Sequence, residues 1–243
     1  MSSIHRIVSC LMLVAIAGCD APSGPSSGAV SGSGSLVQQQ YDEPVALKES
    51  LFKEDQAVIG NAEIEKILSS KLTLPENARL AAVRFGSLPY WWGWSEDFVR
   101  LSQDMDSKFL GELKKSTRLR DVEYLPTLVT PQQMTLPYLR QAAARFQADL
   151  LLIYRTSSRT YDKPGFFSPD QTKAYCTVEA VLLDTRTGIV PFSTVVTEDF
   201  FAKRTSNDSD FSETIAKAQQ QAISKAWLTL AQQTVDFLNA APH

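Results

Sequence analysis

The sequence predicts an α/β (α+β) domain built on a five-stranded mixed sheet. Three features lead to this prediction. Apolar segments typical of strands alternate with amphipathic helical segments, three strand-like segments then follow one another, and a long amphipathic segment closes the chain. We expect the order β-α-β-α-β-β-β-α, with two helices on one face and the long C-terminal helix packed back across the sheet.

The first half of the domain alternates strands with helices. Strands are expected over 78–86 and 122–129, and helices over 62–70, 95–115 and 137–146. Ser95 is expected to cap the second of these helices, because two acidic residues follow it in the first turn. Pro126 lacks a backbone donor, which predicts that the strand around it lies at an edge of the sheet.

The second half is expected to form a β-meander. The apolar run Leu150 to Ile153 is typical of a central strand that is covered on both faces. This strand is expected to begin near Ala148 and to continue past Tyr161 into a turn. Two returning strands are then expected over 172–184 and 189–201, joined by a tight turn that ends in a glycine.

A long amphipathic helix is expected over 211–238, with Asp210 or Ser212 as its N-cap. Its apolar stripe consists of Phe211, Ile215, Ile223, Trp227, Leu230 and Phe237. This stripe predicts that the helix packs on the sheet.

The N-terminal segment has the features of an export signal. Two basic positions, His5 and Arg6, precede the apolar run Ile7 to Ala17, which is too short to span a membrane. The run ends in Ile-Ala-Gly-Cys19, which resembles the lipobox of bacterial lipoproteins, where the cysteine receives the lipid. We therefore predict a lipoprotein signal peptide over 1–18 and lipidation of Cys19.

A flexible tether is expected after the lipidated cysteine, because residues 20–40 are rich in Ser, Gly, Pro and Gln. The lipidated cysteine and tether are assigned to 19–45, and a single globular periplasmic domain to 46–243. Asp20 resembles the inner-membrane retention signal of enterobacterial lipoproteins. The expected location is therefore a lipid-anchored position facing the periplasm, with the inner membrane favoured over the outer.

The composition argues against several kinds of site. Of the two histidines, His5 lies in the predicted signal peptide and His243 is the last residue, so neither a His-dependent triad nor a His-ligated metal site is expected. Neither a metal nor another cofactor is predicted. A net charge of −3 gives no sign of a nucleic-acid-binding protein. Cys176 is expected to be a buried strand residue without a disulfide partner.

Carboxylates are the remaining candidates for catalysis. They are Asp149, Glu179, Asp184, Glu198 and Asp199, at the ends and interiors of the expected strands. Their spacing does not single out a catalytic pair. We therefore expect turn residues and solvated strand faces, and a protein that is not an enzyme.

The element order and four sequence phrases resemble the curli-secretion lipoprotein family and the N-terminal domain of the TolB type. The phrases are Leu80 to Phe85, Phe109 to Glu123, Ala142 to Ile153 (AAARFQADLLLI) and Val181 to Gly188 (VLLDTRTG). In that group a helix ends in Ala-Asp before the central strand, and a later strand ends in Asp-x-x-Thr-Gly before a hairpin. The resemblance implies a periplasmic domain with this order of elements.

The best-known members of the family form secretion pores by extending two hairpins into the outer membrane. Such hairpins need strands of about ten residues with an apolar, lipid-facing side. Here Thr156 to Thr160 and Thr197 to Asp199 place polar groups on both faces. We therefore expect a member without a pore, and relatives of that kind are mostly accessory envelope lipoproteins with binding or assembly roles.

Two aromatic clusters are the candidate contact surfaces for a partner or a membrane. They are Tyr90, Trp91, Trp92 and Trp94 after the first strand, and Phe166 and Phe167 at the expected hairpin tip. The tryptophan cluster is either exposed or a lid packed over the end of the sheet.

Three functions remain open. The first is a non-enzymatic binding, assembly or accessory role in the envelope, which predicts an envelope protein partner. The second is a subunit of an oligomeric secretion channel, which predicts a homo-oligomer. The third is a carboxylate-dependent hydrolase of envelope glycans, which predicts a deep pocket with two carboxyl groups roughly 5 to 9 Å apart.

Overall fold

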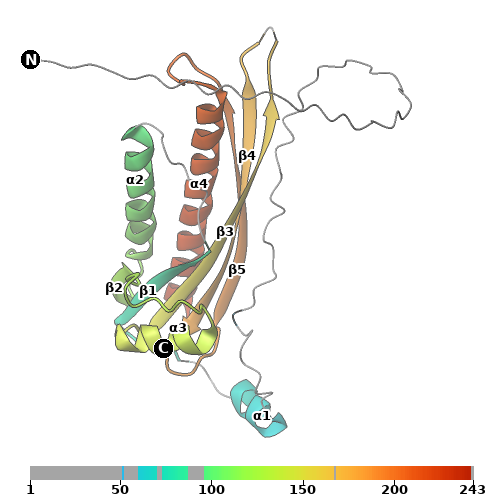
Figure 1. Cartoon of the computed structure of the whole chain (residues 1–243). Coiled ribbons are helices and arrows are strands. Elements are labelled where there is room, and N and C mark those ends of the chain that lie inside the picture. Colours follow the sequence, from blue (N-terminus) through green and yellow to red (C-terminus); the bar gives the residue numbers. More distant parts are fainter. Residues whose placement is uncertain (1–50, 52–59, 70–72, 87–95, 167, 242–243) are drawn as a thin grey trace, which may run out of the picture. The chain divides into compact units, whose positions relative to one another are not determined.

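The structure is a computed structural model of the chain, and it describes residues 51, 60–69, 73–86, 96–166 and 168–241 (Figure 1). The predicted signal peptide, the lipidation site Cys19, the sorting residue Asp20 and the predicted tether lie outside the described residues. None of the helices in the described part has the length and apolar character needed to cross a membrane.

The secondary structure follows the predicted order. The helices are α1 (Asn61–Ser69), α2 (Glu96–Leu113), α3 (Leu136–Arg145) and α4 (Phe211–Ala240). The strands are β1 (Ala78–Phe85), β2 (Leu119–Tyr124), β3 (Leu150–Lys163), β4 (Gln171–Asp184) and β5 (Phe192–Lys203). From β1 onward, the order β-α-β-α-β-β-β-α is confirmed.

The strands form one five-stranded mixed sheet in the order β2-β1-β3-β4-β5. β1 pairs in parallel with both β2 and β3, whereas β3, β4 and β5 form an antiparallel meander. The chain thus moves one way across the sheet from β1 to β2 and the opposite way from β2 to β3. Since such crossovers are almost always right-handed, this reversal places α2 and α3 on opposite faces. The helix that shares a face with α2 is therefore α4, and not α3.

The face covered by α2 and α4 contains the larger core. At its centre, the rings of Phe109, Tyr154 and Trp227 pack with centroid distances of 5.2, 5.3 and 5.5 Å. The indole N–H of Trp227 donates to the Oγ1 of Thr156 at 3.0 Å, which satisfies the polar atom of a fully buried side chain. The predicted packing of the C-terminal helix on the sheet is confirmed.

The opposite face is covered by α3 only near one end. Leu139 and Ala143 of α3 pack with a small core on β1, β3 and β4 that extends along β3 as far as Ile153. β3 itself continues to Lys163. Beyond Ile153, none of the described helices packs on this face of the meander.

The boundaries of β2 differ from the prediction. The strand runs over 119–124 instead of 122–129, because it pairs with β1 from Ala78 onward and its polar residues Asp121 and Glu123 form ion pairs with Arg79. It ends before Pro126, which lacks the donor needed to continue the ladder. Its position at an edge is confirmed.

The predicted start of α4 is also confirmed. The carboxylate of Asp210 accepts a hydrogen bond at 2.9 Å from the backbone N–H of Glu213, as expected of an N-cap. Ser95, the predicted cap of α2, lies outside the described residues.

Candidate functional site

The candidate site is the side of the meander that faces away from α4. Burial alternates along β4, so that Ala174, Cys176 and Val178 point into the core while the residues between them remain partly exposed. The register of the three strands brings these outward residues into rows. We call this surface the open face; it comprises the odd-numbered residues 155–163 of β3, 171–181 of β4 and 193–203 of β5.

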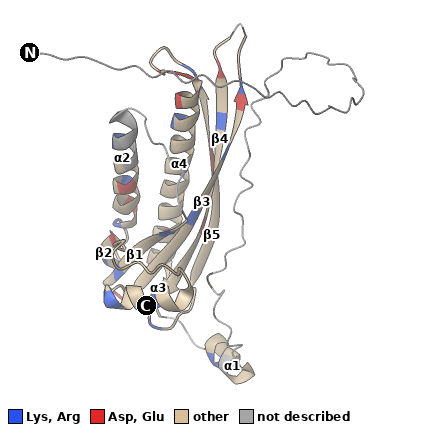
Figure 2. Cartoon of the chain, in the orientation of Figure 1, with Lys and Arg blue, Asp and Glu red and all other residues tan. Residues whose placement is uncertain are grey.

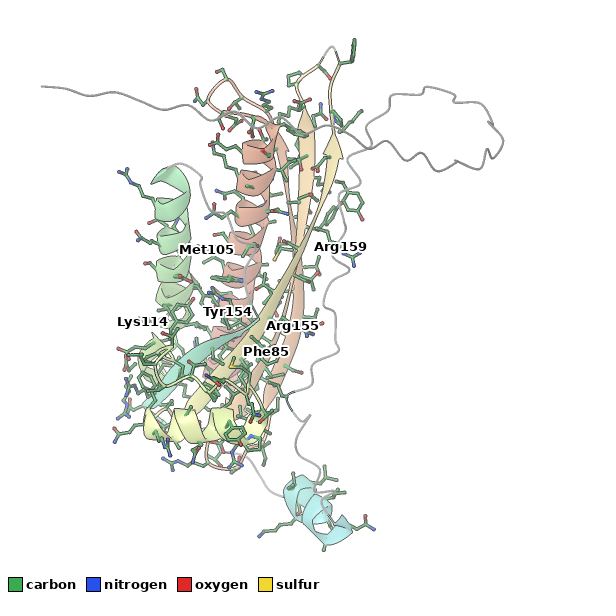
Figure 3. All side chains as sticks on the ribbon, in the orientation of Figure 1. Phe85, Met105, Lys114, Tyr154, Arg155 and Arg159 are labelled. Carbon is green, nitrogen blue, oxygen red and sulfur yellow. The ribbon has the colours of Figure 1, made fainter. Side chains whose placement is uncertain are left out.

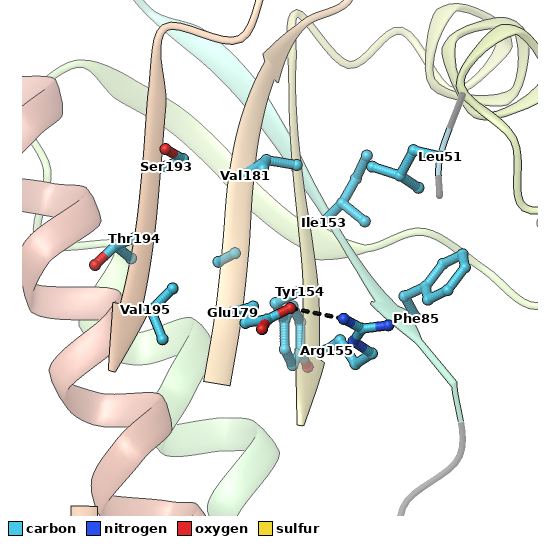
Figure 4. Close-up of a pocket in the computed structure, with 11 residues that line it drawn as sticks. Leu51, Phe85, Ile153, Tyr154, Arg155, Glu179, Val181, Ser193, Thr194 and Val195 are labelled. Atoms are coloured by element: carbon cyan, nitrogen blue, oxygen red, sulfur yellow. Dashed lines mark hydrogen bonds and ion pairs between the residues drawn. The ribbon is translucent and has the colours of Figure 1, made fainter. Parts of the chain in front are cut away.

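The end of the open face near α3 forms an apolar cavity of about 590 Å³. Figure 4 shows Leu51, Ile153 and Val181 on one side of it and Val195 on β5 at the other. Val195 is 66% exposed, although it is a strand residue with an aliphatic side chain. We use the name apolar half for this end of the open face together with the three cavity residues beside it, Leu51, Phe85 and Ile153; its residues on the open face are Arg155, Glu179, Val181, Ser193 and Val195.

An ion pair lies at the base of the apolar half. The Nη2 of Arg155 lies 2.7 Å from the Oε2 of Glu179, its direct cross-strand neighbour (Figure 4). Glu179 is the one acidic residue among the described residues that line the cavity. Because its carboxylate is bound to a guanidinium, the cavity offers a polar anchor and not a pair of carboxylates for acid–base chemistry.

Leu51 is held at the rim by a backbone contact. Its carbonyl oxygen accepts a hydrogen bond at 2.8 Å from the backbone N–H of Leu136, at the first turn of α3. The side chain packs against the small core that contains Ile153 and Leu183. The described residue nearest to the predicted tether therefore lies directly at the cavity.

The other end of the open face carries cations and aromatic rings, and we call it the cationic half. Its three rows are Arg159, Tyr175 and Asp199; Tyr161, Lys173 and Phe201; and Lys163, Gln171 and Lys203. Figure 3 shows Arg155 and Arg159 projecting from β3 away from α4. Between the two halves lies a row of hydroxyl side chains, Ser157, Thr177 and Thr197. The Oγ1 atoms of Thr177 and Thr197 are 3.0 Å apart, within hydrogen-bond distance.

Two hydrogen-bonded phenol groups lie on the covered face, and Tyr154 is buried while Tyr124 is half-buried. Tyr154 donates to the hydroxyl of Tyr124 at 3.3 Å, and Tyr124 donates to the carboxylate of Asp106 at 2.9 Å. Burial raises the pKa of Tyr154 to about 12, while burial together with Tyr154 and Asp106 raises the pKa of Tyr124 still further. Both phenols therefore stay protonated at neutral pH and link α2 to β2 and β3.

Of the predicted aromatic contacts, the structure describes one. Phe166 lies at the turn between β3 and β4 and is 94% exposed, as expected of a residue at a hairpin tip. Phe167 and the cluster of Tyr90, Trp91, Trp92 and Trp94 lie outside the described residues, so their predicted contacts remain predictions.

Cys176 is fully buried on β4, as predicted. Burial among apolar side chains raises the pKa of its thiol to about 12, so the thiolate is not formed at neutral pH. Within the described part of the chain, no cluster of three or more His, Cys, Asp or Glu residues is placed to hold a metal ion.

The five candidate carboxylates all have structural partners. Asp149 pairs with Arg186, Glu179 with Arg155, and Asp199 with Lys173. Asp184 accepts from the backbone N–H of Thr187 in the tight turn, and Glu198 accepts from Thr229 of α4. The structure therefore gives each of these carboxylates a local hydrogen-bond or ion-pair partner.

Sequence reasoning missed the residues of the open face. It treated Thr156 to Thr160 as polar on both sides, and it did not consider Tyr161, Tyr175 and Val195 together. The alternation in 171–184 was visible in the sequence and is a signal for one exposed side. The residues of three strands become neighbours only through the register of the meander.

No protein-family model matches the chain, and no curated protein matches it either. Solved structures do resemble it in backbone arrangement. A hypothetical protein from Chlamydia trachomatis is 11% identical, with a TM-score of 0.44, and the match covers 68% of this chain and 99% of that one.

Two further matches are described as lipoproteins. A minor lipoprotein from Acinetobacter baumannii is 11% identical with a TM-score of 0.35, and the match covers 68% of this chain and 94% of that one. A lipoprotein from Neisseria meningitidis is 11% identical with a TM-score of 0.29, and the match covers 61% and 99% of the two chains. Bacterial lipoproteins are thus among the structural neighbours of this chain, and its finer resemblance to the curli-secretion and TolB types remains a prediction.

Proposed function

We propose that this chain is a lipid-anchored protein of the bacterial cell envelope that binds a partner protein through the apolar half of the open face and is not an enzyme. The observation that carries the proposal is the cavity of about 590 Å³, lined by Leu51, Phe85 and Ile153 and bordered by the exposed Val195. A concave apolar surface with a few polar groups is the usual form of a binding site.

A protein side chain suits this cavity better than a small polar substrate. Its walls are aliphatic and aromatic, and its one acidic side chain is already paired with Arg155. A partner that inserts an apolar side chain would remove this surface from water and gain the free energy of its burial.

The predicted anchor would keep this surface near a membrane. The predicted tether over 19–45, as a flexible chain, would have a root-mean-square reach of roughly 30 Å. Because Leu51 lies at the rim of the cavity, the partner would be bound close to the point where the tether joins the domain.

Lipidation is tested in cells with the variant Cys19→Ser. We expect the wild-type chain to incorporate radiolabelled palmitate and to fractionate with membranes, and the variant to do neither. The variant Asp20→Ser tests sorting, since it should move the protein from the inner-membrane to the outer-membrane fraction. Labelling of the Cys19→Ser protein would contradict the anchor.

Partner binding is tested by placing a photo-crosslinking amino acid at Val195 of the full-length chain in cells. We expect a discrete adduct with an envelope protein. The matched control position is Leu128, which is also aliphatic, is 97% exposed and lies in the loop after β2, outside the open face. The same adducts from both positions, or none from Val195, would overturn the proposal.

The affinity for the identified partner can also be measured after substitution of Val195. Val195→Glu would place a charge at the rim of the cavity and should weaken binding of the identified partner at least about tenfold, or 1.4 kcal/mol. Leu128→Glu adds the same charge outside the open face and should leave the affinity unchanged.

A further inference from the structure

The cationic half of the open face differs in charge from the rest of the molecule. It presents Arg159, Lys163, Lys173 and Lys203, although the chain as a whole has a net charge of −3. Figure 2 shows Lys and Arg residues in blue, together with Asp and Glu residues in red, on the upper part of the meander. In the outward rows, four cations face one acidic residue, Asp199, which creates a local positive potential on a chain that is negative overall.

Most of these cations are not neutralised by neighbouring carboxylates. The one acidic residue in the three rows is Asp199, whose Oδ2 lies 3.1 Å from the Nζ of Lys173. In the described part of the chain, Arg159, Lys163 and Lys203 form no ion pair. Their charges are therefore available to an anionic ligand.

Aromatic rings lie between the cations. Tyr161 and Tyr175 pack edge to face with centroids 5.6 Å apart, and Tyr161 is 65% exposed. The Nζ of Lys173 lies 4.8 Å from the centre of the Tyr175 ring, and that of Lys203 lies 5.9 Å from the centre of the Phe201 ring. The rings are thus held in place by neighbours; Tyr161 and Phe201 present a large area to solvent, and Tyr175 is half-buried.

The surface is also long and narrow. Along β3, Arg155, Arg159 and Lys163 recur every fourth residue, which places them about 13 Å apart on the same side of the strand. The hydroxyl row of Ser157, Thr177 and Thr197 crosses the sheet between the first two of these cations. Charges, rings and hydroxyl groups therefore alternate along one direction.

We propose that the cationic half binds a linear acidic polysaccharide. Sugar rings would stack on Tyr161 and Tyr175, sugar hydroxyls would hydrogen-bond to the hydroxyl row, and carboxylate or sulfate groups would pair with Arg159, Lys163 and Lys203. A second copy of the chain is disfavoured as the occupant, because a two-fold contact would bring two positive surfaces together. This site is separate from the cavity proposed to bind a protein partner.

The test measures binding of a fluorescein-labelled oligogalacturonate to the full-length chain in detergent by fluorescence anisotropy. An uncharged maltooligosaccharide with the same label is the control probe. We expect the acidic probe to bind, with an affinity that falls as the salt concentration rises, and the uncharged probe to bind at least about tenfold more weakly, a difference of 1.4 kcal/mol.

Two matched pairs of variants locate the site. The double variant Arg159→Glu with Lys163→Glu should lose at least about tenfold in affinity, or 1.4 kcal/mol. Lys114→Glu with Arg145→Glu makes the same change of charge at exposed positions outside the meander, one just after α2 and one on α3, and should change affinity less than about twofold, or 0.4 kcal/mol. Tyr161→Ala should weaken binding, whereas Tyr138→Ala on α3 should not.

Several results would overturn the inference. They are equal losses in the two double variants, equal affinity for both probes, or no binding of the acidic oligosaccharide under conditions where polyglutamate or vesicles containing phosphatidylglycerol bind. All four charge-reversal positions are exposed, so the unfolding transitions of these variants should match that of the wild type. Photo-crosslinking at Val195 reports on the protein partner independently, so failure of one proposal does not imply failure of the other.

Discussion

The two faces of the β3–β4–β5 meander are built from the same strands and have opposite properties. Towards α4, β4 presents small and aliphatic residues such as Ala174, Val178 and Leu182, all buried. Away from α4, the same strand presents Lys173, Tyr175 and Glu179, which remain partly exposed. Strand alternation thus lets one element contribute to the core and to a candidate binding surface at once.

The difference arises from how far each helix reaches. α4 extends over 30 residues and packs along β4 and β5, whereas α3 has 10 residues and its core ends at Ile153. We therefore expect the free energy of folding to depend on the covered face, and binding to depend on the open face. Substitutions on the covered face should therefore destabilise the protein more than substitutions on the open face.

The largest effect is expected from Trp227→Ala on the covered face. The indole is fully buried between Phe109 and Tyr154, so its removal leaves a cavity and an unpaired Thr156 hydroxyl. The free energy of unfolding should fall by about 3–5 kcal/mol, measured by urea denaturation. A loss below about 1 kcal/mol would show that this face does not hold the main core.

Alkaline pH should destabilise the covered face through its tyrosines. The pKa of Tyr154 is about 12 in the folded protein and about 10 in the unfolded chain, so the folded state retains the proton over this range. The contribution of this group to the free energy of unfolding is therefore fully present below pH 10. It is lost as the pH rises from about 10 through the folded pKa of about 12, and the loss is on the order of 2 kcal/mol.

Tyr154→Phe removes this titration while keeping the ring. The unfolding free energy of the variant, measured between pH 8 and pH 12, should fall less steeply than that of the wild type. Tyr138→Phe, at an exposed position on α3, is the matched control and should follow the wild-type curve. If the unfolding free energies of the wild type and of Tyr154→Phe fell equally steeply with pH, the raised pKa of Tyr154 would be contradicted.

An acid-sensitive contact holds the start of α4 to the loop after β5. Burial alone would raise the pKa of Asp208, but hydrogen bonds from Lys217 at 2.9 Å and from the backbone N–H of Thr205 at 2.7 Å lower it well below its usual range. A lowered carboxyl pKa contributes stability above about pH 4, and that stability is lost as pH falls through the folded pKa.

Asp208→Asn tests this contact. The variant should unfold more easily than the wild type at pH 7, and the difference should shrink as the pH falls below about 4. Asp236→Asn, on the exposed side of α4, is the matched control and should behave as the wild type. If the difference in unfolding free energy between Asp208→Asn and the wild type grew towards acid pH, the lowered pKa of Asp208 would be contradicted.

The smallest effects are expected on the open face. Val195→Ala and Tyr161→Ala remove exposed side chains and should change the free energy of unfolding by no more than about 0.5 kcal/mol. Differential scanning calorimetry of both variants beside Trp227→Ala provides the comparison. If either variant lost as much unfolding free energy as Trp227→Ala, the open face would contribute to stability as strongly as the covered face, which would contradict the proposed division.

The sequence alone determined the elements of the fold, because each element leaves a local pattern. The spacing of Phe109 and Leu113 indicated a helix, the run Leu150 to Ile153 indicated a central strand, and Asp210 or Ser212 indicated the start of α4. β2 was displaced because its start depends on pairing with β1 and on ion pairs to Arg79, which are contacts between residues distant in the sequence.

Which side of the meander the described helices leave uncovered depends on contacts in the tertiary structure. That outcome depends on the reversal of direction between the two crossovers, which separates α2 from α3, and on the short reach of α3 along β3. The rows of Arg159 with Tyr175 and of Tyr161 with Lys173 likewise exist only through strand register. Local periodicity specifies helices and strands, whereas the sites between them require contacts that periodicity does not encode.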